Sequence, residues 1–407
     1  MKVFIVAAKR TPIASMLGAL KGVDAVDFGA EVVKQLILDT GINPAVIDEV
    51  IVGNVLSANC GQGPARQIAV KAGIPYQVPA YSLNMVCGSG MKSVINGYDA
   101  ICTGRADVIV AGGTESMSRA PMLIPPTTRS GHKMGHIQVT DHMLHDALTD
   151  AYSGVHMGIT AENIAQKHAL TREQQDEFAL ESQQKAIAAV DGGVFDEEIV
   201  PITIKNKKGD IVFARDEYPN RTTDAQKLSA LRPAFKSDGT VTAGNASGIN
   251  DGASFVMLAS EKAVKEYGLK PLAQIVAVGQ GGVDPQYMGL GPVPAVLNAL
   301  KNAKMTLSDI DVLELNEAFA AQSLGVVKEL SESCGVSQKD ILAKTNVNGG
   351  AIALGHPVGA SGNRILVSLI YQLRRSHKKT GLASLCIGGG MGTAIIINSV
   401  EAEKEDK

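Results

Sequence analysis

The sequence predicts an α/β fold made of two similar halves, each a mixed sheet covered by layers of helices. Short apolar segments typical of strands alternate along the chain with amphipathic helical patterns, as expected when helices cover the faces of a sheet. The same order of features occurs twice. With 407 residues, 45% hydrophobic and 19% charged, the chain is long enough for two or three domains with their own cores.

The individual elements follow from apolar periodicity and turn residues. Helix 89–102 is typical, because its apolar residues Met91, Val94, Ile95 and Tyr98 recur at helical spacing. One more helix is expected from Arg172 to Ala189, where Thr171 and Gln174 form a capping box. Strands are expected at residues 3–8, 49–53, 107–112, 254–259, 311–315, 383–388 and 393–398, and the other helices at 27–40, 64–72, 317–331 and 361–375.

Matching features in the two halves indicate an internal duplication. The distance between partners increases slowly along the chain, which is the expected result of a duplication with small insertions. Four pairs carry the argument: Asn54 and Asn316 (316 − 54 = 262), Asn84 and Asn348 (348 − 84 = 264), Ser89 and Ser361 (361 − 89 = 272), and Gly112 and Gly388 (388 − 112 = 276). Such a long period indicates paired domains and not a repeat array.

A long insertion interrupts the first half. For the matching residues Gly252 and Gly392, the sequence separation falls to 392 − 252 = 140. About 276 − 140 = 136 additional residues therefore separate two strands of the first half whose counterparts follow each other directly in the second half. We therefore expect residues 1–113 with 252–270 to form the N-terminal half, 114–251 an inserted loop domain, 271–399 the C-terminal half and 400–407 a charged tail.

Composition excludes several classes of function. The net charge of −3 gives no electrostatic footprint for nucleic acid or an anionic membrane. No apolar run approaches the ~18 residues of a membrane helix, and Lys9 and Arg10 follow the first apolar segment too soon for a signal peptide. Five scattered cysteines indicate a reducing, cytoplasmic location and no disulfide framework.

Cys87, His356 and Cys386 lie in glycine-rich loops, where they are the candidates for chemistry. Neighbouring glycines allow a substrate to approach closely. Cys87 directly precedes a helical pattern, a position that favours the thiolate. Two thiols and an imidazole predict covalent acyl transfer with separate acid–base roles. Each of these residues, taken alone, also fits a structural role. Their positions near strand ends in both halves favour an active site, because α/β folds bind ligands at the carboxyl ends of their strands.

Other candidates are weaker. Cys60, Cys102 and Cys334 are expected to be small core residues. The sequence Gly88 to Ser93 does not complete a dinucleotide-binding glycine motif. A cluster of histidines and aspartates fits no compact zinc pattern, so we expect no metal and no cofactor. That cluster contains His132, His136, Asp141, His142, His145 and Asp146.

Five motifs together resemble the thiolase family. They are Asn-x-x-Cys-Gly-Ser-Gly from Asn84, Gly-Gly-x-Glu-Ser-Met-Ser from Gly112, Asn-Glu-Ala-Phe-Ala from Asn316, Gly-His-Pro-x-Gly-Ala-Ser-Gly from Gly355, and Cys-x-Gly-Gly-Gly-Met-Gly from Cys386. The resemblance covers nearly the whole chain in order. It implies the thiolase fold, with two halves that form five layers and a loop domain inserted in the first half.

The resemblance also assigns catalytic roles. Cys87 is implied to be the nucleophile that takes the acetyl group, and His356 to accept its proton. His356 and a water held by Asn316 would bind the enolate-like oxygen of the second acetyl group, whose α-proton Cys386 removes. Backbone N–H groups of Cys87 and Gly388 would form the other oxyanion hole. Because both thiols would have to reach the same acyl group, Cys87 and Cys386 are expected to lie close together. With a low pKa at Cys87, we also expect them to form a reversible disulfide under mild oxidation.

The implied substrates are acetyl-CoA and acetoacetyl-CoA, because His156-Met157-Gly158 and Met288 resemble the short-chain, biosynthetic members of the family. Coenzyme A is implied to contact Leu148, His156, Met157, Phe235, Ala243, Ser247, Met288, Ala318 and Phe319, with Arg221 at the nucleotide end. The segment around Arg221 departs from the family pattern. The family also implies a homotetramer, built as a dimer of dimers.

Three alternatives stay open. A degradative 3-ketoacyl-CoA thiolase of broader chain length would have the same motifs. Other condensing enzymes of this fold usually have histidine or asparagine at the position of Cys386, so that cysteine argues against them. A non-catalytic acyl-CoA carrier would not need Cys87, His356 and Cys386 together.

Overall fold

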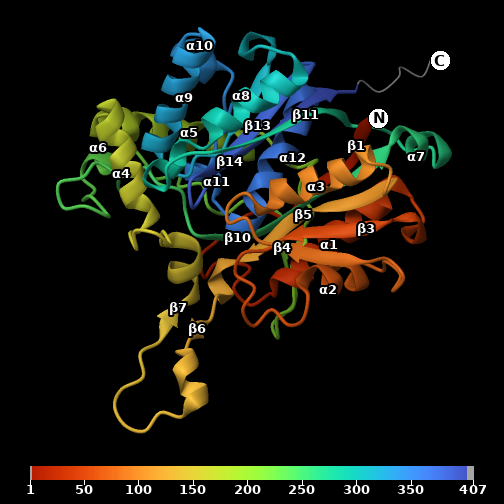
Figure 1. Ribbon diagram of the computed structural model, residues 1–407, viewed down its shortest axis with the longest axis horizontal. Helices are drawn as coiled ribbons and strands as arrows, with labels where there is room; N and C mark the ends of the chain where they lie inside the picture. The colour runs from red at the N-terminus through yellow and green to blue at the C-terminus, as the bar shows by residue number, and fades with distance from the viewer. Residues whose placement is uncertain (1, 401–407) are drawn as a thin grey trace.

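A single sheet of ten strands forms the centre of the computed structural model, which describes residues 2–400 (Figure 1). Residues 401–407 of the predicted charged tail lie outside the described residues. The strand order is β12-β13-β14-β11-β1-β10-β5-β3-β4, with β2 paired to β10. The strands are β1 Val3–Arg10, β2 Ala14–Ser15, β3 Glu49–Gly53, β4 Ala80–Leu83, β5 Val108–Ser116, β10 Asn250–Ser260, β11 Ala273–Gly282, β12 Val312–Leu315, β13 Thr380–Ile387 and β14 Met391–Ser399.

The strand order repeats outward from the centre. In the first half, β1 is antiparallel to β10, β10 is antiparallel to β5, and β5 is parallel to β3. In the second half, β11, β14, β13 and β12 repeat these directions. Strand β4 continues the first half, and a single parallel bridge from Leu313 to Thr345 stands at the matching place in the second. The expected duplication is therefore confirmed, although pairing of β1 with β11 joins the two halves into one sheet.

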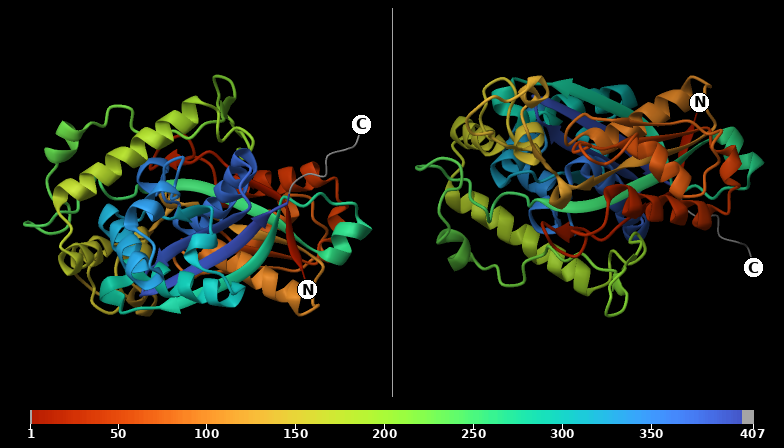
Figure 2. Two further views of the ribbon diagram at one scale, coloured as in Figure 1. Left: turned by 90° about the horizontal axis from the view of Figure 1, so that it is seen from above. Right: turned by 90° about the horizontal axis from the view of Figure 1, so that it is seen from below.

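Helices and strands alternate in five layers (Figure 2). Helices α1 (Ala25–Thr40) and α2 (Pro64–Lys71) cover the outer face of the first half, and α8 (Pro292–Ala303) and α9 (Ala320–Cys334) cover that of the second. Helices α3 (Ser89–Cys102) and α12 (Val358–Ser376) lie between the halves. Strand alternation produces this division: Val108 and Val110 of β5 face the outer core, whereas Ile109 and Ala111 face the central one.

The sequence analysis missed β11 and α8; in β11, glycines weaken the strand pattern. A Cβ on Gly279 of β11 would lie 2.2 Å from the Ala295 carbonyl oxygen, so α8 packs directly on the strand backbone. The predicted helices 317–331 and 361–375 are confirmed with shifted bounds, Ala320–Cys334 and Val358–Ser376. Three shorter helices, α7 Glu261–Glu266, α10 Gln338–Ala343 and α11 Ala351–Leu354, complete the two halves.

The segment between β5 and β10 contains smaller elements that pack against both halves. Its helices are α4 Met157–His168, α5 Arg172–Asp191 and α6 Ala225–Ser229, and its hairpins are β6 Met122–Leu123 with β7 Thr140–Asp141 and β8 Ile202–Ile204 with β9 Ile211–Phe213. The predicted capping box of Thr171 and Gln174 is present at the start of α5. In the part of the chain from residue 2 to 400, no helix combines the length and apolar character needed to cross a membrane.

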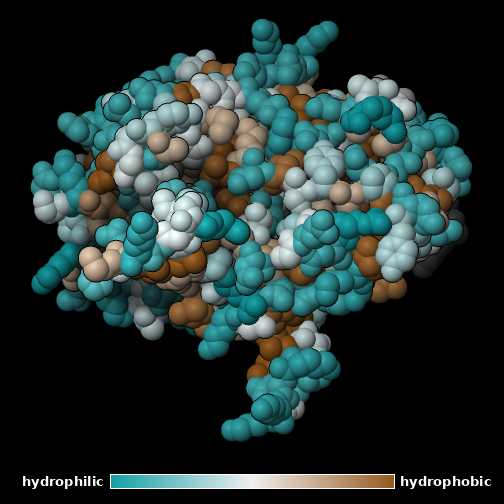
Figure 3. All heavy atoms as spheres, turned by 60° about the horizontal axis from the view of Figure 1, so that its bottom comes forward, coloured by the Kyte–Doolittle hydropathy of each residue, from teal (hydrophilic) through white to brown (hydrophobic). Residues whose placement is uncertain are grey.

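An arm extends from the body between β6 and β7 (Figures 1 and 3). Its large hydrophobic side chains are exposed to an unusual degree, and Figure 3 shows hydrophobic atoms where the arm leaves the body. The exposed residues are Met122, Ile124, Met134, Ile137 and Val139. Exposed apolar surface of this kind is typical of a protein–protein contact.

Candidate active site

The two central helices bring the candidate residues together. Gly90 of α3 and Gly362 of α12 are matching positions of the duplication, and the helices touch there. A Cβ on Gly90 would lie 2.8 Å from the Gly359 carbonyl oxygen, and one on Gly362 would lie 2.7 Å from the Met91 backbone nitrogen. Only glycine allows the two backbones to approach this closely. The helix N-termini, preceded by the Cys87 and His356 loops, therefore lie side by side.

Cys87 is half-buried one residue before Gly88, the N-cap of α3, and follows Val86. Val86 has a φ of 47°, a left-handed conformation that is strained for a β-branched residue. Burial raises the pKa of the Cys87 thiol to about 11, although the N–H groups of Gly388 and of Cys87 itself act in the opposite direction. The expected resting thiolate is therefore wrong, because desolvation outweighs the helix position. The thiol must therefore lose its proton during the reaction. The predicted disulfide with Cys386 assumed a low pKa for Cys87, and the raised pKa removes this argument for rapid oxidation.

His356 is buried and held from two directions. Its backbone N–H donates to Asn250 Oδ1 at 2.8 Å, and its Nδ1 lies 2.6 Å from Ser361 Oγ. The Ser361 hydroxyl also lies 2.9 Å from the Pro357 carbonyl oxygen, so its single hydrogen has two alternative acceptors. Rotation of this hydroxyl supports either tautomer of the imidazole. Burial and, secondly, the charge of Arg364 lower the pKa of His356 to about 3, which keeps the ring neutral.

Cys386 is buried at the end of β13, close to Cys87. Burial raises the pKa of the Cys386 thiol, and the neighbouring Cys87 raises it further. Gly388 follows in the turn to β14. A Cβ placed on Gly388 would lie 3.4 Å from a methyl carbon of Val86 and 3.6 Å from the Met157 sulfur. The Gly388 N–H thus faces the Cys87 sulfur in a site bordered by apolar side chains.

Asn316 directly follows β12 and is buried. Its backbone N–H donates to the Ser384 carbonyl oxygen at 3.0 Å. Its Oδ1 accepts a 3.5 Å contact from Nη2 of Arg364. Within residues 2–400, its Nδ2 has no hydrogen-bond partner. The side chain therefore presents an unused donor, a group well suited to a substrate oxygen or a bridging water.

Five of the ten predicted coenzyme A residues form one apolar cluster with Cys386. Phe235 stacks on His156 with ring centroids 4.6 Å apart and meets Phe319 edge-on at 6.2 Å. The Ser247 N–H donates to the Ala318 carbonyl oxygen at 2.9 Å. The cluster contains Met157, Phe235, Met288, Ala318, Phe319 and Cys386, whereas Leu148 packs in a neighbouring cluster with Cys87.

Two predicted residues, Arg221 and Ala243, line a separate cavity of about 520 Å³ next to this cluster. Arg221 is exposed, and its guanidinium makes a two-pronged contact with Asp191 at 2.7 and 2.8 Å. The cavity lies outside the apolar cluster. An anionic ligand at Arg221 would compete with Asp191.

Sequence reasoning missed Glu115, which links the two halves. Its buried carboxylate accepts hydrogen bonds from Asn54 Nδ2, the Val55 and Leu56 N–H groups and the Gly359 N–H, at 2.9–3.0 Å. Burial raises the pKa of Glu115 to about 7. The carboxylate fixes the loop that carries His356 against the end of β3. The signal was present in the sequence as a charged residue shortly after the apolar segment predicted as the strand 107–112.

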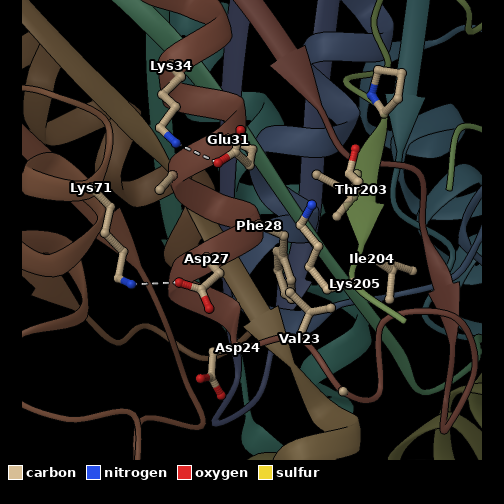
Figure 4. Close-up of a pocket in the computed structure, with 14 residues that line it drawn as sticks. Val23, Asp24, Asp27, Phe28, Glu31, Lys34, Lys71, Thr203, Ile204 and Lys205 are labelled. Atoms are coloured by element: carbon tan, nitrogen blue, oxygen red, sulfur yellow. Dashed lines mark hydrogen bonds and ion pairs between the residues drawn. The ribbon is translucent and has the colours of Figure 1, made fainter. Parts of the chain in front are cut away.

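A cavity of about 680 Å³ between α1 and β8 contains none of the predicted site residues (Figure 4). Its lysines are paired, Lys34 with Glu31 at 2.6 Å and Lys71 with Asp27 at 2.8 Å. It therefore offers little free charge to select a ligand. The histidine cluster of the sequence is also engaged internally, because His142 and His145 each place Nδ1 2.6 Å from Asp146.

The five-layer fold and this constellation define a class of protein: an α/β enzyme suited to acyl transfer through cysteine. The comparisons give the family. Residues 3–262 match the thiolase N-terminal domain and residues 269–399 match the thiolase C-terminal domain. The chain belongs to the thiolase family and is an acyltransferase.

Similar proteins include a "Probable acetyl-CoA acyltransferase" of Staphylococcus aureus (strain COL), 53% identical over 398 residues that cover 98% of this chain and 99% of the relative. The structure of an acetyl-CoA acetyltransferase from Syntrophomonas wolfei is 45% identical, with a TM-score of 0.95. Human mitochondrial 3-ketoacyl-CoA thiolase is also 45% identical, with a TM-score of 0.92. Each of these two structures covers 98% of this chain and is itself covered to 99%. Because the sequence identity to both kinds of thiolase is equal, it does not indicate the acyl chain length of the substrate. That length has to be inferred from the side chains of the pocket.

Proposed function

We propose that this protein is an acetyl-CoA C-acetyltransferase, which condenses two molecules of acetyl-CoA to acetoacetyl-CoA and coenzyme A and also runs in reverse. The observation that carries the proposal is that Cys386 and Cys87 are neighbours beside an apolar cluster that contains two methionines, with the chain that follows His356 against the start of α3. The comparisons support thiolase chemistry in general, and the acetyl specificity rests on this cluster.

In the first half-reaction, Cys87 Sγ attacks the carbonyl carbon of acetyl-CoA while His356 Nε2 takes the thiol proton. The N–H groups of Cys87 and Gly388 receive the oxyanion of the tetrahedral intermediate. When the carbon–sulfur bond to coenzyme A breaks, His356 returns the proton to the leaving thiolate, so acetyl-Cys87 and free coenzyme A result. Loss of one such oxyanion donor typically costs about 10²–10³ in rate.

In the second half-reaction, Cys386 removes an α-proton from a second acetyl-CoA. Both thiols have raised pKa values, so the Cys386 proton first moves to the neutral imidazole of His356, which returns it to Cys386 at the end of the cycle, and the enolate needs strong stabilisation. His356 and a water bound by Asn316 supply hydrogen bonds to the enolate oxygen. The new carbon–carbon bond forms as acetyl-Cys87 breaks, and the Cys87 thiolate recovers the proton held by Cys386.

The apolar cluster favours a short acyl group. Met157 and Met288 are both buried, and the Met157 sulfur lies near Gly388, where the acyl carbon would bind. Buried methionines can close the acyl end of the pocket, and positions with such flexible side chains tolerate substitution. A long 3-ketoacyl chain would have to displace them.

Steady-state thiolysis of a substrate series tests the specificity. We expect kcat/KM for acetoacetyl-CoA to exceed that for 3-ketohexadecanoyl-CoA by more than tenfold, since each buried methylene that finds no room loses ~0.8 kcal/mol. Met157→Ala should narrow this ratio, whereas Met305→Ala, in the outer core near α8, should leave it unchanged. Equal kcat/KM for both chain lengths in the unaltered protein would instead establish a degradative 3-ketoacyl-CoA thiolase.

We also propose a cytoplasmic homotetramer built as a dimer of dimers. All five cysteines are free thiols, which suits a reducing compartment. The exposed hydrophobic side chains of the arm support self-association.

A further inference from the structure

Arg364 is a buried arginine with an unusual environment. It lies in α12, is 2% exposed, and Nε and Nη1 have no hydrogen-bond partner among residues 2–400. Glu314, equally buried on β12, is 3.9 Å from Nη1. Arg10, by contrast, has its donors occupied by Glu198 and Asp216 at 2.6–2.9 Å. A poorly paired buried guanidinium is costly, so Arg364 contributes little to stability, and its position needs another explanation.

Nη2 of Arg364 donates to Asn316 Oδ1 at 3.5 Å. A guanidinium carries donors only, so it can face the oxygen of an amide but not its nitrogen. Arg364 therefore fixes the orientation of the Asn316 side chain, with Oδ1 toward α12 and Nδ2 away from it. Nδ2 is the buried donor left free on the side of the site.

The duplicated half provides an internal comparison. Asn54 matches Asn316, but its Nδ2 donates to the Thr114 carbonyl oxygen at 3.1 Å and to Glu115 Oε1 at 3.0 Å. Lys92 of α3 matches Arg364 and is only half-buried. In the first half, a carboxylate therefore uses the amide N–H, whereas in the second half a cation holds the amide oxygen and leaves the N–H available.

Taking the proposed condensation as its basis, we propose that Arg364, backed by Glu314, is a positioning residue that aims Asn316 Nδ2 at the water that binds the oxygen of the developing enolate. Glu314 faces the guanidinium at 3.9 Å without a direct hydrogen bond. Burial raises the pKa of this carboxyl, whereas the charge of Arg364 lowers it. Arg364 acts through Asn316 and does not touch the reacting atoms.

The test separates the two half-reactions. Acetylation of Cys87 is followed by mass spectrometry with acetyl-CoA, and enolisation by deuterium exchange at the acetyl methyl group in D2O. Arg364→Met should lower exchange by about 10²-fold, the loss typical of one oxyanion donor, and leave acetylation within about threefold. Arg364→Lys, which keeps a donor, should recover part of the exchange. Lys92→Met, at the matching position of α3, should leave both rates unchanged.

A double-mutant cycle decides whether Arg364 works through Asn316. Asn316→Ala alone should lower exchange, and adding Arg364→Met should lower it no further, within about twofold. If the double variant loses exchange by the product of the two single losses, the proposal is overturned. Equal losses of acetylation and exchange in a variant with native circular dichroism would also overturn it. If Arg364→Met does not fold, Arg364→Met with Glu314→Gln removes both buried charges and supports the same comparison.

The outcomes also separate this proposal from the proposed function. If the unaltered protein neither acetylates Cys87 nor exchanges the α-protons, the condensation itself is wrong. If the unaltered protein catalyses both reactions and Arg364→Met exchanges α-protons at the same rate, only the positioning role of Arg364 is wrong.

Discussion

The close contact between α3 and α12 predicts that a single methyl group at Gly90 damages catalysis. In Gly90→Ala, the new Cβ would lie 2.8 Å from the Gly359 carbonyl oxygen and 3.1 Å from the Asn363 backbone nitrogen. Both are backbone atoms, so neither can move without moving α12. The helices would have to separate by about 0.6 Å to bring the 2.8 Å approach to an ordinary 3.4 Å contact.

Two terms set the expected change in stability. Overpacking of a core typically costs about 1–3 kcal/mol, and replacing a helical glycine by alanine recovers about 0.5–1 kcal/mol. We therefore expect a net loss of about 1–2 kcal/mol in the free energy of unfolding. The catalytic effect should be larger, because a misplacement near 1 Å can cost about 10²-fold in rate. A reduction of kcat by ten- to hundredfold follows for a shift of this size.

Gly97→Ala is the matched control, because Gly97 lies in the same helix. Its Cβ would meet the Leu258 methyl carbon at 2.8 Å, which is the end of a flexible side chain. Thermal unfolding and kcat for acetoacetyl-CoA thiolysis should be measured for both variants. Gly97→Ala should keep its kcat, and Gly90→Ala should lose it while still folded. A normal kcat in Gly90→Ala, or an equal loss in both, would refute the argument that this contact sets the site.

Three further predictions follow from the site and the arm. Cys386→Ser should leave acetylation of Cys87 intact while α-proton exchange falls by orders of magnitude, and equal loss of both would indicate a structural role. Replacing residues 124–139 by a short flexible linker should convert a tetramer to a dimer in sedimentation equilibrium, and a monomeric unaltered protein would contradict this. His356 favours its neutral form in the folded state, so its stabilising contribution is complete above pH 6.5 and is lost as the pH falls toward 3. Between pH 6.5 and 5 this amounts to about 2 kcal/mol, and urea unfolding of His356→Asn should lose that part of the slope.

The layers of the fold could be predicted because the strands and helices that build them are strongly patterned. Alternation in β5 and helical spacing in α3 each identify one buried face. Strand β11 could not be found this way, because Gly279 and Gly281 take the place of apolar residues where α8 packs. The two halves were recognised, but their pairing through β1 and β11 depends on tertiary contact and leaves no local signal.

The candidate site could be predicted as far as the residues that stand in glycine-rich loops. Cys87, His356 and Cys386 were identified from the sequence; the structure places Cys386 next to Cys87 and the chain that follows His356 against the start of α3. The pKa of Cys87 was not predictable, because the helix position was visible in the sequence but the desolvation of the thiol was not. Glu314 had a readable signal, a charge within an apolar strand, but its partner lies fifty residues later (364 − 314) and only the fold shows it.

The structure also explains how a duplicated fold came to hold one asymmetric site. Ser89 and Ser361 are matching residues, and each hydroxyl bonds back to its own loop. Ser89 Oγ accepts from the Met85 backbone N–H, which can only donate, so that hydroxyl has one fixed arrangement. Ser361 meets an imidazole nitrogen instead, which can donate or accept.

Asn54 and Asn316 differ in the same way, since Glu115 occupies the amide of the first and nothing in residues 2–400 occupies that of the second. In each pair the first half keeps a closed structural arrangement and contributes the nucleophile, while the second half retains the adjustable proton carrier and the free donor. Cys386 stands where the first half has Glu115, because Glu115 pairs with Gly252 and Cys386 pairs with the matching Gly392. Asn316→Asp, which replaces the free donor by an acceptor, should therefore suppress enolisation while Cys87 is still acetylated. Unchanged α-proton exchange in that variant would show that the free amide of Asn316 is not what distinguishes the two halves.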